Sequence, residues 1–364
     1  DWLADHGTPF YLWEGLPAPE LSRCLISPGE GITGGSKLIR CLMAALEKKG
    51  VAIHYNTKAV SLVKDECFNV EGVSCITPEG RKDYLARGGV ILTTGGYGAN
   101  EAMVDKYIGP WASRLIVRGS PWITGENILM AEEVQALLVN MDQFYAGPIT
   151  PTGHCNPSPL MHAGYGIQVN TKGKRFVPET WLQVPKAKAI AERTEDNRSF
   201  MLIGADADKN AQILTNTIKR FARLGFEVIK ADTIEEAAKK AGVPEKNLVE
   251  TVREFNAAVK AGKAKELDPP YDYDEPHALE TGPFYMIPAA GGMASTFGGP
   301  KINKDAQVVN FERRPIPGLY AAGAAAGGVW VYDDIGGNQL GGGMVFGRVA
   351  ARHAAGRAAS RKNA

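Results

Sequence analysis

Long apolar runs are missing from the 364-residue chain. No uninterrupted stretch reaches the roughly 18 residues that a membrane-spanning helix needs, so we expect no membrane span. A dominant charge is missing too, because 41 basic residues stand against 40 acidic ones and the net charge is +1. With no basic stripe along the sequence, this balance excludes a nucleic-acid-binding protein.

Cysteine is scarce, and its pattern excludes several kinds of site. The five cysteines are an odd number without CxxC spacing, which argues against a disulfide framework, a zinc ribbon and an iron–sulfur ligand set. His154 and His162 have no carboxylate at ligand spacing, so we expect no metal site. No GxSxG motif is present, which argues against a serine hydrolase. Reduced cysteines suit a cytoplasmic location.

Glycine, in contrast, is abundant, with 42 residues, and it is densest at 318–348. A glycine inside a helix or strand costs about 0.5–1 kcal/mol relative to alanine, so the cluster needs a reason. One reason is a set of tight turns and close backbone crossings; the other is a ligand that touches the main chain. Gly318–Gly323 is typical of a buried strand ending in glycine, and Gly336–Leu340 opens a helical pattern. A glycine loop and a helix start present N–H groups and a positive dipole end to a phosphate or a flavin edge.

Hydrophobic periodicity predicts further helices and strands along the chain. Thr233-Ile234-Glu235-Glu236 is a capping box at the start of an amphipathic helix. We expect one domain in two pieces, 1–112 and 291–364, with a second domain, 113–290, inserted between them. The predicted helices cover 37–49, 128–138 and 245–261, and the predicted strands cover 51–55, 58–63 and 89–92.

Five stretches occur in an order that covers nearly the whole chain: Thr93–Asn100, Thr124–Glu126, Gly173–Phe176, Pro283–Tyr285 and Ile316–Gly323 continuing to Arg348. In this order they resemble the flavoproteins that include soluble fumarate reductases, the flavoprotein subunit of succinate dehydrogenase, urocanate reductase and 3-ketosteroid dehydrogenases. The resemblance implies an α/β fold with a glutathione-reductase-type, Rossmann-like FAD-binding domain. It also implies that 113–290 is an inserted α+β capping domain.

The same resemblance implies FAD as the cofactor and assigns residues to it. Near the adenine it places the main chain of Ala59 and Val60. Near the flavin it places Glu126, in the position of an acidic residue, and a helix start that stabilises negative charge at the N1/O2 edge. The implied cofactor-binding residues are Ala59, Val60, Thr94, Gly95, Gly96, Tyr97, Glu126, Gly323, Gly337, Asn338, Gln339 and Leu340.

Two departures from the family pattern affect the cofactor site. The strand, GxGxxG loop and helix that hold the pyrophosphate in this family have no counterpart in the 364 residues. We expect a second polypeptide to supply the GxGxxG half; the alternatives are that the chain is a fragment or that it does not bind FAD alone. The second departure is Ala324, where the family often has an acidic residue that holds the ribityl chain.

The substrate side departs from fumarate reductases at four positions together. The resemblance places Gln183 where those enzymes have a proton-donating arginine and Asp334 where they have a carboxylate-clamping arginine. Thr150 and Ser295 stand at the positions of clamping histidines. Since Asp334 would repel a dicarboxylate, we do not expect fumarate or succinate as the substrate.

Tyr332, Asp333 and Asp334 are candidates for proton transfer, because neighbouring carboxylates raise one another's pKa toward neutrality. The alternative is a solvated turn. His162 is a further candidate facing the flavin, with a structural or surface histidine as the alternative. Together with Ser295, these residues form the predicted catalytic set.

The resulting prediction is an FAD-dependent dehydrogenase or reductase acting on CH–CH groups. It forms or reduces a C=C bond next to a carbonyl on a neutral or cationic small molecule, cyclic ones included, within a split or heteromeric enzyme. The alternative is a non-catalytic, flavoprotein-derived binding or assembly subunit.

Overall fold

The computed structural model describes residues 2–13, 23–26, 34–151, 166–205, 215, 218–219, 221–222, 225–226, 228–331 and 338–361. The chain forms two compact units. The first comprises Asp1–Ala59 and Ser74–Lys82, and the second comprises Val60–Val73 and Asp83–Ala364.

The first unit contains a short helix, a two-stranded sheet and an amphipathic helix. Strand β1 (Phe10–Trp13) pairs antiparallel with β2 (Arg23–Ile26), and α1 (Trp2–Asp5) and α2 (Gly34–Lys48) stand on either side of them in the sequence. Helix α2 lies where helical periodicity predicts it. The prediction of a strand at 51–55 is wrong: the segment pairs with no strand, and Tyr55 is 70% exposed. β-propensity reflects packing against neighbouring strands, which this segment lacks.

A three-stranded sheet follows in the sequence, with the order β3 (Lys58–Lys64), β4 (Val70–Thr77) and β5 (Gly80–Leu85). The boundary between the two units passes through these strands. The strand predicted at 58–63 is therefore confirmed, and it is the segment that carries Ala59 and Val60.

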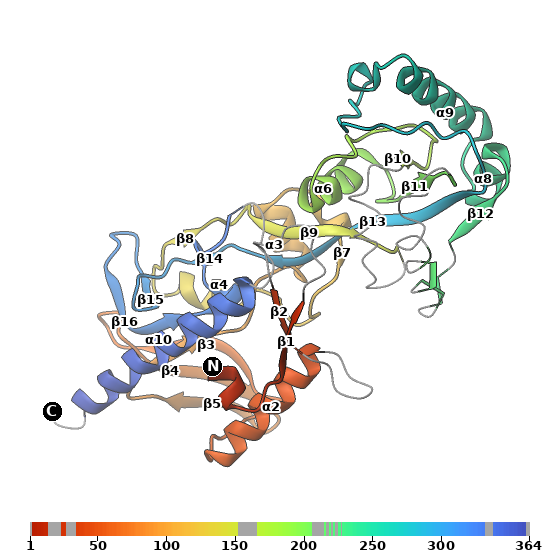
Figure 1. The fold of residues 1–364 in the computed structure, drawn as a ribbon. Helices are drawn as coiled ribbons and strands as arrows, with labels where there is room; N and C mark the ends of the chain where they lie inside the picture. The colour runs from red at the N-terminus through yellow and green to blue at the C-terminus, as the bar shows by residue number, and fades with distance from the viewer. Residues whose placement is uncertain are drawn as a thin grey trace. The chain divides into compact units, whose positions relative to one another are not determined.

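The second unit contains a small sheet of order β15-β16-β6, covered by a long helix (Figure 1). Strand β16 (Pro315–Ala321) runs parallel to β6 (Val90–Leu92) and antiparallel to β15 (Gln307–Val309). Helix α10 (Asn338–Ser360) packs Phe346 and Ala350 against Tyr320 of β16. The positive φ of Gly318, 82°, lets its main chain pass close to the carbonyl oxygen of Val70, where a Cβ would lie only 2.2 Å away.

A larger sheet of the second unit is organised around one long strand, β13 (Phe284–Thr296). Its first half pairs with β11 (Ser199–Ile203) and β12 (Ile229–Ala231), and β11 pairs with β10 (Gly166–Asn170). Its second half pairs with β9 (Phe144–Ile149) and, in parallel, with β7 (Ile116–Val117). The predicted domain boundary at residue 290 lies inside β13, so the strand is continuous across it.

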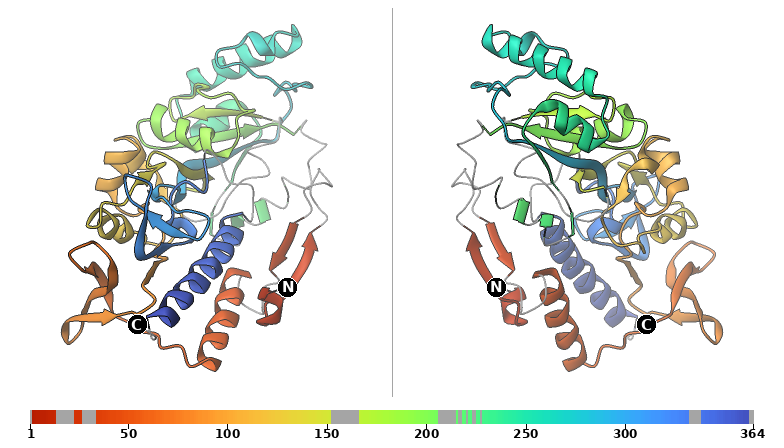
Figure 2. Two further views of the ribbon diagram at one scale, coloured as in Figure 1. Left: turned by 90° about the vertical axis from the view of Figure 1, so that its left-hand side faces the viewer. Right: turned by 90° about the vertical axis from the view of Figure 1, so that its right-hand side faces the viewer.

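Two helices cover the β10-β11-β12 end of this sheet, as Figure 2 shows for the teal helix α9. Helix α8 (Ile234–Ala241) begins at Thr233, whose Oγ1 accepts a hydrogen bond from Glu236 N, and α9 (Glu245–Lys260) follows. The Thr233 cap and the 245–261 helix are therefore confirmed, and the Glu236 carboxylate accepts a 2.8 Å hydrogen bond from Asp232 N, one residue before the cap. Buried Leu202, Leu248, Phe255 and Met286 belong to the core that joins helices and sheet.

The remaining elements of the described chain are short. The predicted helix at 128–138 is α4 and ends early, at Glu132, because Gln135 adopts a positive φ of 57° and Leu138 joins a strand. These elements are α3 (Glu101–Tyr107), η2 (Ala112–Arg114), α4 (Glu126–Glu132), β8 (Leu138–Val139), α6 (Gln183–Arg193), η4 (Ala264–Glu266), β14 (Gly299–Pro300) and η5 (Gly323–Ala325). None of the helices in the described part of the chain combines the length and apolarity of a membrane span.

Candidate active site

Two glycine loops lie side by side at the carboxyl ends of neighbouring parallel strands. The first loop follows β6 at Thr93–Gly96, and the second follows β16 at Ala322–Gly323. Ala322 N donates a hydrogen bond of 3.1 Å to Leu92 O, which holds the two loop starts together. The carboxyl edge of parallel strands is where open α/β sheets bind ligands. The fold thus joins two segments that lie more than two hundred residues apart in the sequence.

Thr296, at the end of β13, holds the first loop in place through a hydrogen bond. Thr296 Oγ1 accepts a hydrogen bond of 3.0 Å from Tyr97 N, and a Cβ on Gly96 would lie 2.1 Å from the same oxygen. Gly95 has a φ of +80°. Glycine is therefore required at 95 by conformation and at 96 by space. Thr94 is exposed beside them.

Tyr97 is turned away from solvent into the protein core. Its side chain is fully buried, its hydroxyl donates to Met141 O, and its ring packs edge-on against Tyr107 at 5.6 Å between centroids. Burial raises the pKa of the Tyr97 phenol. The predicted contact of Tyr97 with the cofactor would therefore use its main chain.

Glu126 begins helix α4 beside the second loop. Its carboxylate accepts a 2.6 Å hydrogen bond from Thr124 Oγ1. The next residue, Asn127, is fully buried and donates from Nδ2 to Ala325 O at 3.0 Å. This bond ties the start of α4 to η5, the 3₁₀ turn that begins at Gly323.

The first turn of α10 meets the end of β13. Ser295 Oγ donates a hydrogen bond of 3.1 Å to Gln339 Oε1. The structure thus brings together a residue predicted for the substrate side and one predicted for the cofactor side. Gly323 faces Gly343 of α10, with 3.8 Å from the Cβ position of Gly323 to the Gly343 Cα. The α10 start, η5 and the end of β13 therefore surround one region.

The residues at this region fit the ring end of a flavin. The N-terminus of the 23-residue helix α10 carries main-chain N–H groups with no partner inside the helix and a positive dipole end. A Cβ on Gly341 would meet no atom of the described residues within 4 Å, which leaves open space against this part of the helix backbone. Leu340, 45% exposed, adds apolar surface beside it. Amide donors, open glycine surface and an apolar side chain suit an isoalloxazine edge.

Other predicted site residues cannot be placed at this region. Tyr332, Asp333, Asp334, His162 and Gly337 lie outside the described residues. Asn338 is described only as the first residue of α10. Ala59 and Val60 lie in β3, at the end of the first unit and the start of the second. The roles of all these residues stay predictions.

Sequence reasoning missed two residues that shape this region. Thr296 organises the first glycine loop, and Arg118, just after β7, places a buried guanidinium nitrogen over Gly147, which Gln183 also approaches. Neither residue belongs to a motif. The close approach of Thr296 Oγ1 to Gly96 explains why residue 96 is glycine. This contact is visible in the structure but not in the sequence.

The Gly173–Phe176 motif supports the sheet rather than the candidate site. Arg175 Nη2 lies 2.6 Å from Glu179 Oε2, and the two side chains are only 6% and 2% exposed. Lys186 Nζ donates to Glu179 O at 2.7 Å, and burial lowers the pKa of Lys186 to about 8. The motif thus holds a buried charged network in place.

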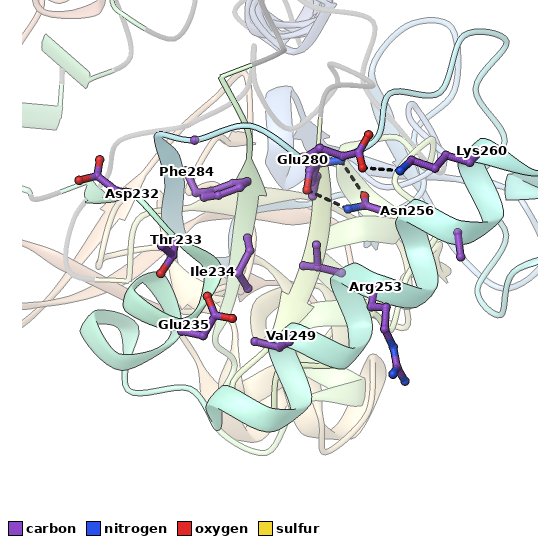
Figure 3. Close-up of a pocket in the computed structure, with 14 residues that line it drawn as sticks. Asp232, Thr233, Ile234, Glu235, Val249, Arg253, Asn256, Lys260, Glu280 and Phe284 are labelled. Carbon is purple, nitrogen blue, oxygen red and sulfur yellow. Dashed lines mark hydrogen bonds and ion pairs between the residues drawn. The ribbon is translucent and has the colours of Figure 1, made fainter.

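The pocket in Figure 3, about 630 Å³, lies elsewhere, between α8, α9 and the segment before β13. Its lining includes the exposed Lys260–Glu280 ion pair, and none of the predicted site residues lines it. Among the residues that the structure describes, no group of three His, Cys, Asp or Glu side chains is placed to hold a metal ion.

Comparison with known proteins gives a consistent match. A family model described as "FAD binding domain" matches residues 1–340. The probable fumarate reductase Ifc3 of Shewanella frigidimarina is 29% identical over 329 residues, which is 90% of this chain and 54% of that protein. The chain thus spans about half the length of this curated relative.

Two solved structures are also similar. The open conformation of a flavocytochrome c3 fumarate reductase has a TM-score of 0.80 at 28% identity and covers 98% of this chain and 62% of its own. A 3-ketosteroid-Δ4-(5α)-dehydrogenase from Rhodococcus jostii RHA1, solved with 4-androstene-3,17-dione, has a TM-score of 0.69 at 26% identity, covering 97% and 77%. The fold is therefore the mixed α/β flavoprotein fold of these two proteins.

Proposed function

Because the chain belongs to the FAD binding domain family, we propose that it is part of an FAD-dependent oxidoreductase that forms or reduces a C=C bond next to a carbonyl. The observation that carries the proposal is the Ser295–Gln339 hydrogen bond, which joins the end of β13 to the first turn of α10. The similarity to a fumarate reductase and to a ketosteroid dehydrogenase supports the bond class. The Gln183, Asp334, Thr150 and Ser295 replacements support a substrate other than a dicarboxylate.

FAD is the cofactor of this family, and its flavin supplies hydride transfer. In our proposal Thr94, Gly95 and Gly96 contact the dinucleotide, while Gly323 and the first turn of α10 bind the ring. The amides of that turn stabilise negative charge at the ring edge. Ser295 orients Gln339, and a proton moves through Tyr332, Asp333 or Asp334.

We also propose that the pyrophosphate cradle comes from outside these 364 residues, on the same polypeptide or on a second one. The proposed arrangement has 113–290 as a cap between 1–112 and 291–364, with β13 leading from the cap to the flavin. The absence of a GxGxxG loop from the described strand–helix connections supports the first part.

Spectroscopy of the protein isolated from its natural source tests the cofactor. We expect the isolated protein to show flavin absorbance bands. If a second polypeptide supplies the GxGxxG loop, we expect it to co-purify. Reduction of enones and unsaturated acids by the reduced holoprotein tests the reaction. A folded, colourless protein would favour the non-catalytic alternative.

A matched pair of glycine variants tests the position of the flavin. Gly341 and Gly356 both lie in α10, and a Cβ on either would meet no protein atom within 4 Å. G356A should leave FAD binding unchanged, whereas G341A should release FAD more readily during dialysis. Equal retention of FAD in both variants would show that the flavin does not bind at the start of α10.

A further inference from the structure

A buried guanidinium nitrogen without a hydrogen-bond partner lies close to the candidate active site. Arg118 follows β7, and its main-chain N–H donates to Met293 O at 2.7 Å, which fixes its backbone beside β13. Its Nη1 is buried, and no atom of the described residues accepts a hydrogen bond from it. No ion pair of Arg118 occurs among the described residues.

Two other polar groups converge with Arg118 over the backbone of Gly147 in β9. The position that a Cβ on Gly147 would take lies 3.2 Å from Arg118 Nη1 and 2.9 Å from Gln183 Oε1. The Tyr145 hydroxyl donates to the same Gln183 oxygen at 3.1 Å. Because residue 147 has no side chain, the polar side chains of Arg118, just after β7, and Gln183, at the start of α6, approach one spot on the sheet.

This polar cluster, Arg118, Tyr145 and Gln183, is adjacent to the proposed flavin region. Tyr145 and Ser295 are directly opposed in the β9–β13 ladder, so their side chains stand on the same face of the sheet. Ser295 in turn bonds to Gln339 of α10. A substrate bound against the proposed flavin region would therefore lie within reach of the cluster.

An unpaired guanidinium nitrogen is costly to bury, because it loses its hydration without gaining an acceptor. Gln183 is neutral, and Tyr145 directs its hydroxyl to Gln183 rather than to Arg118. Among the residues that the structure describes, the arrangement lacks an anionic acceptor. A carboxylate matches a guanidinium in both geometry and charge, and a carboxylate can be conjugated to the C=C bond of the proposed reaction.

Building on the proposed function, we propose that Arg118 is a substrate-binding residue that hydrogen-bonds a single carboxylate conjugated to the reacting C=C bond. The substrate class narrows from carbonyl compounds in general to monocarboxylic 2-enoates. One guanidinium binds one carboxylate, which agrees with the expectation that dicarboxylates are not substrates. This replaces the expectation of a neutral or cationic substrate.

Three probes that share the phenyl–CH=CH–C=O unit test the assignment: cinnamate, cinnamamide and 4-phenylbut-3-en-2-one. With reduced methyl viologen as electron donor, we expect the holoprotein to reduce cinnamate with a kcat/KM at least tenfold above those of the amide and the ketone. R118M should lower kcat/KM for cinnamate at least about 100-fold and change the other two less than threefold. R118K should recover part of the loss. Equal losses on all three probes, or none, would overturn the proposal.

A matched control and a measurement without turnover separate this inference from the proposed reaction. Arg114, on the preceding η2 turn, is exposed and donates to Thr194 O, so R114M should keep the cinnamate preference. Cinnamate should raise the melting temperature of the unmodified holoprotein and leave that of R118M unchanged. If no probe is reduced but this difference appears, Arg118 binds carboxylate and the proposed reaction fails. If the probes are reduced but R118M responds like the unmodified protein, the reaction stands and the role of Arg118 fails.

Discussion

At the scale of single residues, the clearest contrast is between buried and exposed ion pairs of similar length. Arg175–Glu179 is almost wholly buried, whereas Lys172–Glu195 has side chains that are 63% and 81% exposed at 2.5 Å. Removing one partner of a buried pair leaves an uncompensated charge in the interior. An exposed pair returns to water when it is broken.

E179A should therefore destabilise the protein by about 3–5 kcal/mol in urea-induced unfolding. The loss includes the acceptor for Gln168 N, which bonds to Glu179 Oε1 at 2.9 Å. E195A is the matched control, and it should leave the unfolding midpoint unchanged. Similar effects of the two substitutions would contradict the energetic role assigned to the buried pair.

Lys186 should make stability rise with pH above about 8. Burial lowers the pKa of Lys186 to about 8 in the folded protein from 10.5 as the ordinary value. Between these values the unfolded chain binds more protons than the folded one, so the free energy of unfolding increases with pH. From pH 7.5 to 9.5 we expect a gain of about 2 kcal/mol.

The check on Lys186 is urea-induced unfolding at the two pH values for the unmodified chain, K186M and K246M. In K186M the gain should disappear, because methionine has no titrating group. The Glu179 carbonyl oxygen keeps a hydrogen-bond donor in this variant, the Tyr273 hydroxyl. Lys246 is exposed on α9, so K246M should retain the gain. If the unfolding free energy of K186M still rises with pH, groups other than Lys186 cause the rise.

At the scale of elements, the contact between the first glycine loop and β13 limits what position 96 accepts. A Cβ on Gly96 would overlap Thr296 Oγ1, so G96A should cost about 1–3 kcal/mol of stability. T296A alone removes the acceptor of Tyr97 N. In the G96A/T296A double variant the overlap is relieved, and the two losses should not add. Additive losses in thermal unfolding would show that the two positions are independent.

Element prediction from sequence succeeded where the local signal was complete. The Thr233 cap and apolar periodicity identify α8 and α9 without tertiary information. The helix at 128–138 was predicted too long, because the turn at Gln135 and the pairing of Leu138 with Pro300 depend on a distant strand. For the same reason Thr296 and Arg118 were missed: each acts through contacts that no local pattern encodes.

At the scale of the whole molecule, the protection of backbone amides against hydrogen exchange should be highest where buried apolar contacts are densest. The sheet around β13 shares a core with α8 and α9, whereas β1 and β2 form a sheet of two strands only. Two-stranded sheets have little stability of their own. Hydrogen–deuterium exchange should therefore be slowest in β11 and β13 and fastest in β1. Faster exchange in β11 than in β1 would contradict this order.

Strand β13 sets a strict condition on how this chain can change during evolution. Its beginning packs in the α8–α9 core, and its end supplies Ser295 to α10 and Thr296 to the first glycine loop. Because side chains alternate between the two faces, deletion of one residue from the regularly paired part of the strand, Phe284–Met293, would shift Ser295 and Thr296 to the opposite faces. Relatives that diversify their substrates should therefore exchange side chains along this strand and conserve its length.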